Sequence, residues 1–242
     1  MQQPSLLSTK PISPRDRLIF ALDVSTIGEA REWVDRLGDA VTFYKLGLEF
    51  AMSGHYFELL AELCAAGQKV FADLKFSDIP ATVRGAVQNL SRSGAHFCTL
   101  HGVSSVYTEA VKARGSMKLL AITVLTSFGL DDVAEMGWSG PVDDLVSLRA
   151  RKAIAAGIDG LICSPREAER LRRELGPEPI IITPGIRAAS EAGGDDQKRT
   201  MSVEQAFRAG ADHIVVGRPI RKAADPRAAA EAIQREIAQL FA

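Results

Sequence analysis

Cysteine is scarce in this sequence, and no two cysteines stand close together. Cys64, Cys98 and Cys163 form no CxxC pair. A disulfide framework and a zinc site are therefore both disfavoured, and a reducing, cytoplasmic setting is the expectation. Each cysteine lies in an apolar stretch, where a buried thiol acting as a small hydrophobic side chain is the simpler interpretation.

An excess of charge of one sign and long apolar runs are also missing. The formal net charge of the 242 residues is -1, which provides no overall basic field for nucleic acid. No apolar run approaches the roughly 18 residues that suggest a membrane span. Residues 1–15 are polar, rich in Pro and Ser, and without the apolar core of a signal peptide, so we expect a frayed extension there. Neither nucleic acid nor a membrane is an expected partner.

What the sequence does have is a regular alternation of short β-branched apolar runs and longer segments of helical periodicity. Strands are expected at residues 17–24, 41–48, 69–76, 96–102, 118–125, 160–165, 180–185 and 213–220. Helical stretches between them include residues 27–37, 79–93, 142–156 and 203–209. Strict alternation predicts a parallel sheet covered by helices, and eight units in a chain of this length favour an α/β fold of the (β/α)8 barrel type. No linker divides the chain, so residues 16–242 are expected to form one domain.

A doubly wound open sheet is the alternative architecture. Its dinucleotide-binding form carries a GxGxxG motif after the first strand. The corresponding turn here reads Asp23-Val24-Ser25-Thr26, which contains no glycine. The closed barrel is therefore the favoured fold.

Charged residues stand toward the ends of the first three expected strands, where a barrel keeps its active site. Asp23 closes the first strand, Lys45 lies on the second, and Asp73 and Lys75 lie on the third. Because side chains alternate along a strand, Asp73 and Lys75 share a face with Phe71 and point together into the barrel mouth. A structural ion-pair network is the alternative explanation. Charge delivered by three strands to one end favours function, because Lys and Asp are rarely fully buried unless paired.

The segment after the third strand, SDIPAT at residues 77–82, permits two uses of one carboxylate. Asp78 is placed to cap the next helix, with Pro80 in its first turn. Asp78 and Thr82 also stand one helical turn apart, so both can present oxygens to a shared ligand. Capping does not exclude ligand binding.

The turns after the seventh and eighth strands indicate an anion site, because these loops frequently bind phosphate in barrels. Gly217 lets the backbone approach an anion closely, and Arg218 can bind phosphate in a bidentate fork. An ordinary glycine turn is the alternative for Gly217 alone. The polar segment 188–201 adjoins this site and is expected to be a closing lid, with Gln197 able to contact the ligand.

Taken together, the motifs resemble the orotidine 5'-monophosphate (OMP) decarboxylase family. In the family's order they are ALD at 21–23, YKLGLE at 44–49, DLKFSDIPATV at 73–83, VLTS at 124–127, TPGIR at 183–187, DDQKR at 195–199 and IVVGRPI at 214–220. A DxKxxD motif alone also resembles sugar-phosphate decarboxylases and synthases, whereas the full series is specific. The resemblance implies a barrel enzyme that converts OMP to UMP and CO2 without a cofactor or a metal.

The resemblance also implies roles for individual residues. Lys45, Asp73, Lys75 and Asp78 would surround the reacting carbon, with Lys75 stabilising a C6 carbanion and then protonating it. The residues implied to bind substrate are Asp23 and Lys45 at the ribose, Thr126 and Ser127 at the pyrimidine, Gln197, Gly217 and Arg218 at the phosphate, Pro184 and Arg187 in the closing region, and Ile79 and Thr82. In a homodimer, Asp78, Ile79 and Thr82 would reach the active site of the other subunit.

Two alternatives stay open at this point. A magnesium-dependent sugar-phosphate decarboxylase or synthase of the same suite would need a carboxylate on the second strand. Lys45 stands there, and a cation repels a metal ion. A phosphosugar-binding barrel without catalysis is the second alternative, and the paired Asp and Lys residues disfavour it.

Overall fold

The computed structural model of the protein describes residues 5–186 and 201–242. Within these ranges, eight parallel strands pair in chain order and close into a barrel when β8 pairs with β1. The strands are β1 Leu18–Ala21, β2 Phe43–Leu46, β3 Lys69–Phe76, β4 Phe97–Leu100, β5 Lys118–Ile122, β6 Gly160–Ile162, β7 Ile180–Thr183 and β8 His213–Val216. The (β/α)8 barrel is confirmed, and the doubly wound sheet is excluded.

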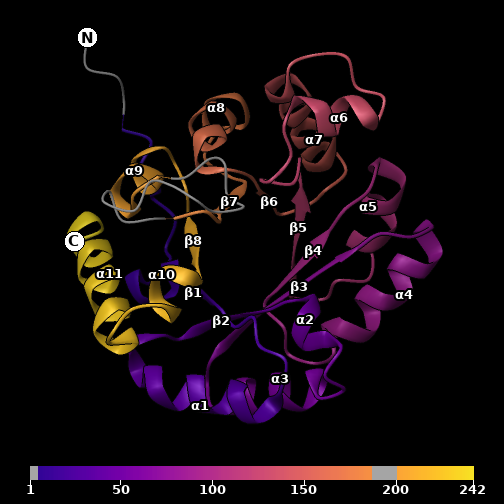
Figure 1. Cartoon of the computed structure of the whole chain (residues 1–242). Helices are drawn as coiled ribbons and strands as arrows, with labels where there is room; N and C mark the ends of the chain where they lie inside the picture. The colour runs from indigo at the N-terminus through magenta and orange to yellow at the C-terminus, as the bar shows by residue number, and fades with distance from the viewer. Residues whose placement is uncertain (1–4, 187–200) are drawn as a thin grey trace.

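Helices follow the strands and form a ring around the barrel (Figure 1). The α-helices are α1 Ile27–Leu37, α2 Leu48–Ala51, α3 Tyr56–Ala65, α4 Pro80–Ser91, α5 Ser104–Val111, α6 Leu130–Glu135, α7 Val142–Ala155, α8 Pro165–Leu175, α9 Val203–Arg208, α10 Arg218–Arg221 and α11 Pro226–Leu240, with 3-10 turns η1 Pro14–Arg17 and η2 Gly38–Ala40. The four helical stretches expected from periodicity coincide with α1, α4, α7 and α9 to within two residues. In the part of the chain that the structure describes, no helix has the length and apolar character needed to cross a membrane.

The strands are shorter than most of the apolar runs that predicted them. The eighth run was expected to extend to residue 220, but the strand ends at Val216 because Gly217 is the N-cap of helix α10. The second strand likewise ends at Leu46, since Gly47 is the N-cap of α2. An apolar run reports burial, which continues into the first turn of the next helix, and not the end of the hydrogen-bonded ladder.

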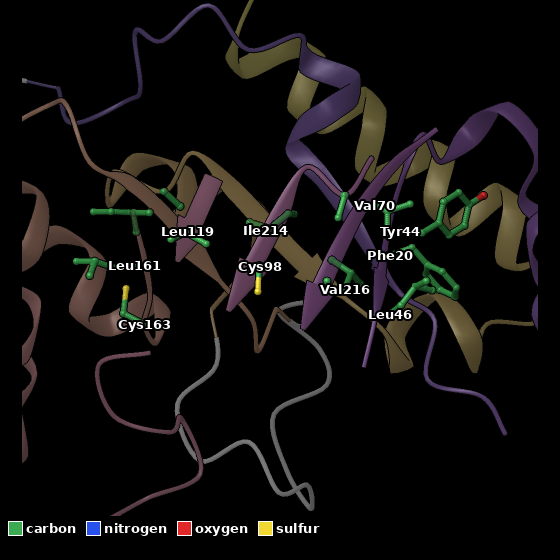
Figure 2. Close-up of a cluster of buried hydrophobic side chains, with 14 of the residues drawn as sticks. Phe20, Tyr44, Leu46, Val70, Cys98, Leu119, Leu161, Cys163, Ile214 and Val216 are labelled. Atoms are coloured by element: carbon green, nitrogen blue, oxygen red, sulfur yellow. The ribbon is translucent and has the colours of Figure 1, made fainter. Parts of the chain in front are cut away.

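Two apolar layers fill the fold on opposite sides of the strands. The inner layer consists of Ile19, Ala21, Phe43, Phe71, Phe97, Leu120, Ile182 and Val215. The outer layer packs the strands against the helices, and Figure 2 shows its strand residues, among them Val70, Cys98 and Ile214. The alternation predicted for the third strand is confirmed, with Phe71 inside and Val70 outside. Inner-face positions beyond this apolar layer lie at the ends of the barrel.

The N-terminal segment makes specific contacts with the barrel from Ser8 onward. The Ser8 hydroxyl donates to a carboxylate oxygen of Asp212, and Lys10 Nζ lies 3.0 Å from the other oxygen of that carboxylate. Lys10 also donates to the backbone oxygens of Pro177 and Pro179. These contacts, at the strand ends opposite the expected active site, correct the expectation of a frayed extension for residues 8–15.

Candidate active site

A cavity of about 330 Å³ opens at the C-terminal ends of the barrel strands. This volume is within the range of small-molecule sites. Charged residues of β2, of β3 and of the turn after β1 line one side, and the turns after β5, β7 and β8 line the rest. The apolar residues on its inner surface are Ala21, Phe71, Ile122, Val124, Ile162 and Val215. A site with such an apolar lining strengthens electrostatic interactions among the charges that face it.

Four charged side chains form a continuous chain of ion pairs along one side of this cavity. Lys45 Nζ lies 2.8 Å from Asp23 Oδ1 and 3.6 Å from Asp73 Oδ2. The other oxygen of Asp73, Oδ1, lies 2.9 Å from Lys75 Nζ. Charges therefore alternate in sign from the turn after β1 across β2 to β3. A side chain at Gly47 would crowd the first pair, since its Cβ would lie 3.2 Å from Lys45 Nζ.

The neighbours of the two central groups hold both in their charged forms. Burial alone would lower the pKa of Lys45, but the carboxylates of Asp73 and Asp23 outweigh it and raise that pKa above its ordinary value. Burial would raise the pKa of Asp73, but the ammonium groups of Lys45 and Lys75 outweigh it and lower that pKa. At neutral pH the cavity wall thus presents Lys45 as an ammonium and Asp73 as a carboxylate.

The backbone of β3 departs from regular strand geometry where it carries these charges. Lys75 has φ 50°, and among the described residues it is the only one other than glycine with a positive φ. The β3–β4 ladder shifts register between Ala72 and Phe76. Thr99 of β4, which the sequence analysis did not identify, contacts both Asp73 and the Lys75 backbone in this interval. No local motif marks a threonine inside an apolar strand, so only the register revealed it.

The turn after β8 brings a glycine and two arginines to the opposite side of the cavity. Gly217, Arg218 and Arg221 all line it. A Cβ at Gly217 would lie 3.2 Å from the Cβ of Ala21, so the turn packs closely on β1. Arg221 was missed from the sequence, although its spacing of three residues from Arg218 within one helix could have indicated a shared face. These features suit an anion.

The remaining predicted contacts come from two other turns. Thr126 and Ser127 follow β5, and Pro184 follows β7; all three line the cavity. Arg187, Gln197 and the expected lid at residues 188–201 lie outside the described residues, apart from Met201. The structure therefore brings together the charged chain, Thr126 and Ser127 after β5, and the turn with Gly217 and Arg218 in a single cavity.

Three predicted site residues do not reach this cavity. Asp78, Ile79 and Thr82 are exposed, and none of them lines it. The expectation that Asp78 caps the next helix is wrong, because the N-cap of α4 is Ile79 and that end has no side-chain cap hydrogen bond. Asp78 Oδ1 instead accepts from the adjacent backbone N–H of Ile79. Pro80 does occupy the first turn, as expected.

The donor chemistry of the cavity does not favour a divalent metal. The ammonium of Lys45 already lies between the carboxylates of Asp23 and Asp73. A metal ion placed there would be repelled by this cation. Across residues 5–186 and 201–242, no group of three or more His, Cys, Asp or Glu side chains could hold a metal ion.

Comparison with known proteins adds independent evidence. Residues 16–233 match the Orotidine 5'-phosphate decarboxylase / HUMPS family. The orotidine 5'-phosphate decarboxylase of Methylococcus capsulatus is 51% identical over 239 residues, which cover 99% of both chains. The protein of the same name from Xanthomonas campestris pv. campestris is 53% identical over 239 residues, or 98% of this chain and 96% of that protein.

A solved structure agrees with the sequence relatives. The crystal structure of orotidine 5'-phosphate decarboxylase from Lactobacillus acidophilus superimposes with a TM-score of 0.82 at 34% identity. The match covers 92% of this chain and 99% of that one. Fold, charged cavity and near full-length similarity lead to one conclusion: this chain belongs to the orotidine 5'-phosphate decarboxylase / HUMPS family.

Proposed function

We propose that this protein decarboxylates OMP to UMP and CO2, the last step of de novo UMP biosynthesis. The observation that carries the proposal is the alternating chain Asp23–Lys45–Asp73–Lys75 on the wall of a cavity whose other side holds Arg218. The names of relatives about half identical over nearly the whole chain support the same activity. One end of the cavity suits a phosphate, and the other suits a reaction that develops negative charge.

The reaction needs a stabilised carbanion and a proton donor. When the bond from C6 to the carboxylate breaks, its electron pair stays on C6 and CO2 leaves, with no attached imine to accept the electrons. Lys75 Nζ, held 2.9 Å from Asp73, stabilises this charge and then donates a proton to C6. Water returns a proton to the lysine. Asp73 also repels the substrate carboxylate, and the repulsion ends when CO2 departs.

The rest of the cavity orients the nucleotide. Asp23 and Lys45 bind the ribose hydroxyls, and Thr126 with Ser127 meets the pyrimidine. Arg218 and the backbone at Gly217 bind the phosphate, and the proposal adds Gln197, Arg187 and Pro184 to the closing region. Phosphate contacts far from C6 supply binding energy for orientation, which raises turnover as well as affinity.

The two competing functions are less well supported. A magnesium-dependent sugar-phosphate enzyme would place its metal among the carboxylates that Lys45 already pairs. A barrel that only binds phosphosugars has no need of a buried, alternately charged wall, because desolvating such charges is costly. The full-length relatives named above carry the decarboxylase name.

One assay separates these functions. Purified protein is incubated with OMP, with and without EDTA, and the loss of ultraviolet absorbance is followed together with UMP formation. We expect equal rates in both samples, because the charged chain supplies its own cations. Activity that disappears with EDTA and returns with magnesium would favour the sugar-phosphate alternative. Binding of OMP without any turnover would favour the phosphosugar-binding barrel.

The active unit in this proposal is a homodimer whose active sites are shared. Asp78, Ile79 and Thr82 lie just past β3 but face away from their own cavity. Ile79 is 66% exposed, and so is Val103 at the start of the neighbouring helix α5. Exposed apolar side chains beside an incomplete charged site are typical of an interface. A second copy of the chain would bury them and bring its Asp78 to the Asp73–Lys75 pair.

Subunit mixing tests this arrangement. Lys75→Ala and Asp78→Ala homodimers are each expected to be nearly inactive. A heterodimer of the two holds one site that lacks both side chains and one complete site, so activity should rise to about half of wild type per heterodimer. Native mass spectrometry monitors subunit exchange. A mixture that exchanges subunits and stays inactive would show that Asp78 serves its own barrel.

We also assign the enzyme to the cytoplasm as part of the proposal. Cys64 and Cys98 are free thiols, and Cys98 is buried. Unpaired cysteines fit a reducing compartment.

A further inference from the structure

Thr99 lies beneath the charged chain and touches two of its members at once. Its side chain is fully buried on the inner face of β4. The hydroxyl donates to Asp73 Oδ1 at 2.9 Å and accepts from the backbone N–H of Lys75 at 2.9 Å. A threonine hydroxyl has a single proton to donate. The Asp73 carboxylate therefore sets the direction of this O–H bond, and a lone pair of the hydroxyl oxygen accepts from the Lys75 N–H.

The strand pairing explains why this hydroxyl is needed. Ala72 pairs with Cys98 and Phe76 pairs with Leu100. Residues 73–75 of β3 therefore lie opposite the single residue Thr99. Such a bulge leaves backbone groups of the longer strand without ladder partners and re-aims side chains. The Thr99 hydroxyl replaces the missing ladder acceptor for the Lys75 N–H.

The bulge also forces Lys75 into a conformation that it would otherwise avoid. A φ of 50° lies in the left-handed region, which is unfavourable for a residue with a Cβ. Strain of this kind persists only where surrounding contacts hold it. Thr99 supplies such a contact at the Lys75 nitrogen. Lys75 Nζ reaches back to Asp73 Oδ1, the same oxygen to which Thr99 donates.

We propose that Thr99 is a positioning residue for decarboxylation. Its one hydroxyl fixes the position of the Asp73 carboxylate relative to the strained backbone of Lys75. This inference rests on the proposed function for its kinetic consequence. Thr99 does not line the cavity, so it acts through the two residues that do. Small displacements of such groups are costly, because catalysis depends on the alignment of the reacting atoms.

The test compares Thr99→Val with Thr99→Ser. Valine keeps the shape and removes the hydroxyl, so kcat should fall on the order of 10- to 100-fold, the worth of a hydrogen bond to a charged group. The Kd for UMP, which lacks the reacting carboxylate, should change less than about threefold, because ribose and phosphate contacts remain. Serine restores the hydroxyl and should recover most of kcat.

A pH profile distinguishes positioning from simple loss of stability. The hydrogen bond from Thr99 is among the interactions that lower the pKa of Asp73, after those with Lys45 and Lys75. Removing it favours the protonated carboxyl, so the acid limb of kcat should move to higher pH in Thr99→Val and return in Thr99→Ser. A purely structural role would leave this limb in place.

Thr123→Val is a matched control. Thr123 is also a buried threonine at the end of a barrel strand, but its hydroxyl donates only to the backbone oxygen of Ile162. It should lose stability with little change in kcat. Equal kcat for wild type and folded Thr99→Val, or equal losses in Thr99→Val and Thr123→Val, would overturn the proposal.

A crystal structure of Thr99→Val gives a readout that needs no activity. We expect Lys75 to leave the left-handed region, or its Nζ to move away from Asp73. A Lys75 φ still near 50° with the ion pair still near 2.9 Å would overturn the positioning role. If wild type fails to decarboxylate OMP, the proposed function fails separately, and this structure still decides whether Thr99 holds the geometry.

Discussion

At the C-terminal end of the barrel, a chain of ion pairs lines one side of a cavity, whereas at the N-terminal end the ion-paired cluster around Asp212 is buried. In the first, the side chains of Asp23 and Lys75 are 41% and 34% exposed. In the second, Asp212 is completely buried and its partner Arg172 is 6% exposed. Both clusters pair carboxylate with cation, so charge pairing alone does not identify an active site.

The two clusters differ in how much of their hydrogen-bonding capacity is used within the protein. Asp212 accepts from Arg172, Lys10, Ser8 and the backbone N–H of Ile181, and burial is outweighed mainly by Arg172 in lowering its pKa. Its hydrogen-bonding capacity is used within the protein. The chain from Asp23 to Lys75 borders open space and can still accept a ligand. A closed network stabilises a fold, while an open one can bind and react.

The largest expected effect would come from Lys75→Ala at the cavity end of the barrel. Lys75 acts mainly in the transition state, so kcat should fall by several powers of ten while the melting temperature changes little. Lys69→Ala is the matched control, because it removes a lysine from the same strand at the opposite end, where it pairs with Asp16. Wild-type turnover in Lys75→Ala would remove the functional distinction between the two ends.

In the buried cluster, Asp212→Asn should affect stability and not turnover. Removing one partner of a buried ion pair leaves the cations of Arg172 and Lys10 uncompensated, at a cost of about 3–5 kcal/mol in the free energy of unfolding. Urea unfolding measures this loss. Asp39→Asn, at an exposed pair with Arg227, should cost less than about 1 kcal/mol. A lower kcat in folded Asp212→Asn would show that the Asp212 cluster also serves the reaction.

At the N-terminal end of the barrel, His213 should also make the stability of the protein depend on pH in the acid range. Its ring packs edge-on against Phe43 and Phe97, and burial lowers its pKa to about 4. The unfolded chain therefore binds more protons between pH 6.5 and 4, so the stability contributed by neutral His213 falls as pH falls through that window, by up to about 3 kcal/mol.

His213→Asn isolates this term. Asparagine can still donate to the backbone oxygen of Asp16, which lies 2.8 Å from Nδ1, but it does not titrate. Urea unfolding at a series of pH values should show a shallower acid decline in the variant than in wild type. Parallel declines in the two proteins would mean that His213 is not the titrating group.

The smallest expected effect concerns the proposed phosphate site of the cavity. Arg218→Ala should weaken OMP far more than phosphate-free orotidine, because a charge-assisted hydrogen bond contributes about 1.5–3 kcal/mol. The comparison of kcat/KM for the two substrates measures this difference. Equal losses for both would show that Arg218 does not bind the phosphate.

Much of the fold was predictable because its signal is periodic. Alternation along β3 correctly placed Phe71, Asp73 and Lys75 toward the barrel interior or mouth. Strand ends were less predictable, since helix α10 starts at Arg218, inside an expected strand. The N-terminal segment was misjudged because Ser8 and Lys10 find their partner, Asp212, about two hundred residues away. Local composition carries no information about such a contact.

The sequence by itself determined the parallel barrel and the identity of its charged residues, because side-chain alternation and strand order follow directly from local pattern. Only the tertiary structure decided that Lys75 Nζ and the Thr99 hydroxyl both donate to Asp73 Oδ1, and that Lys75 has a left-handed backbone conformation. It also decided that Asp78 faces outward. These features arise from register between strands and from packing across the barrel, which depend on pairs of residues remote in sequence.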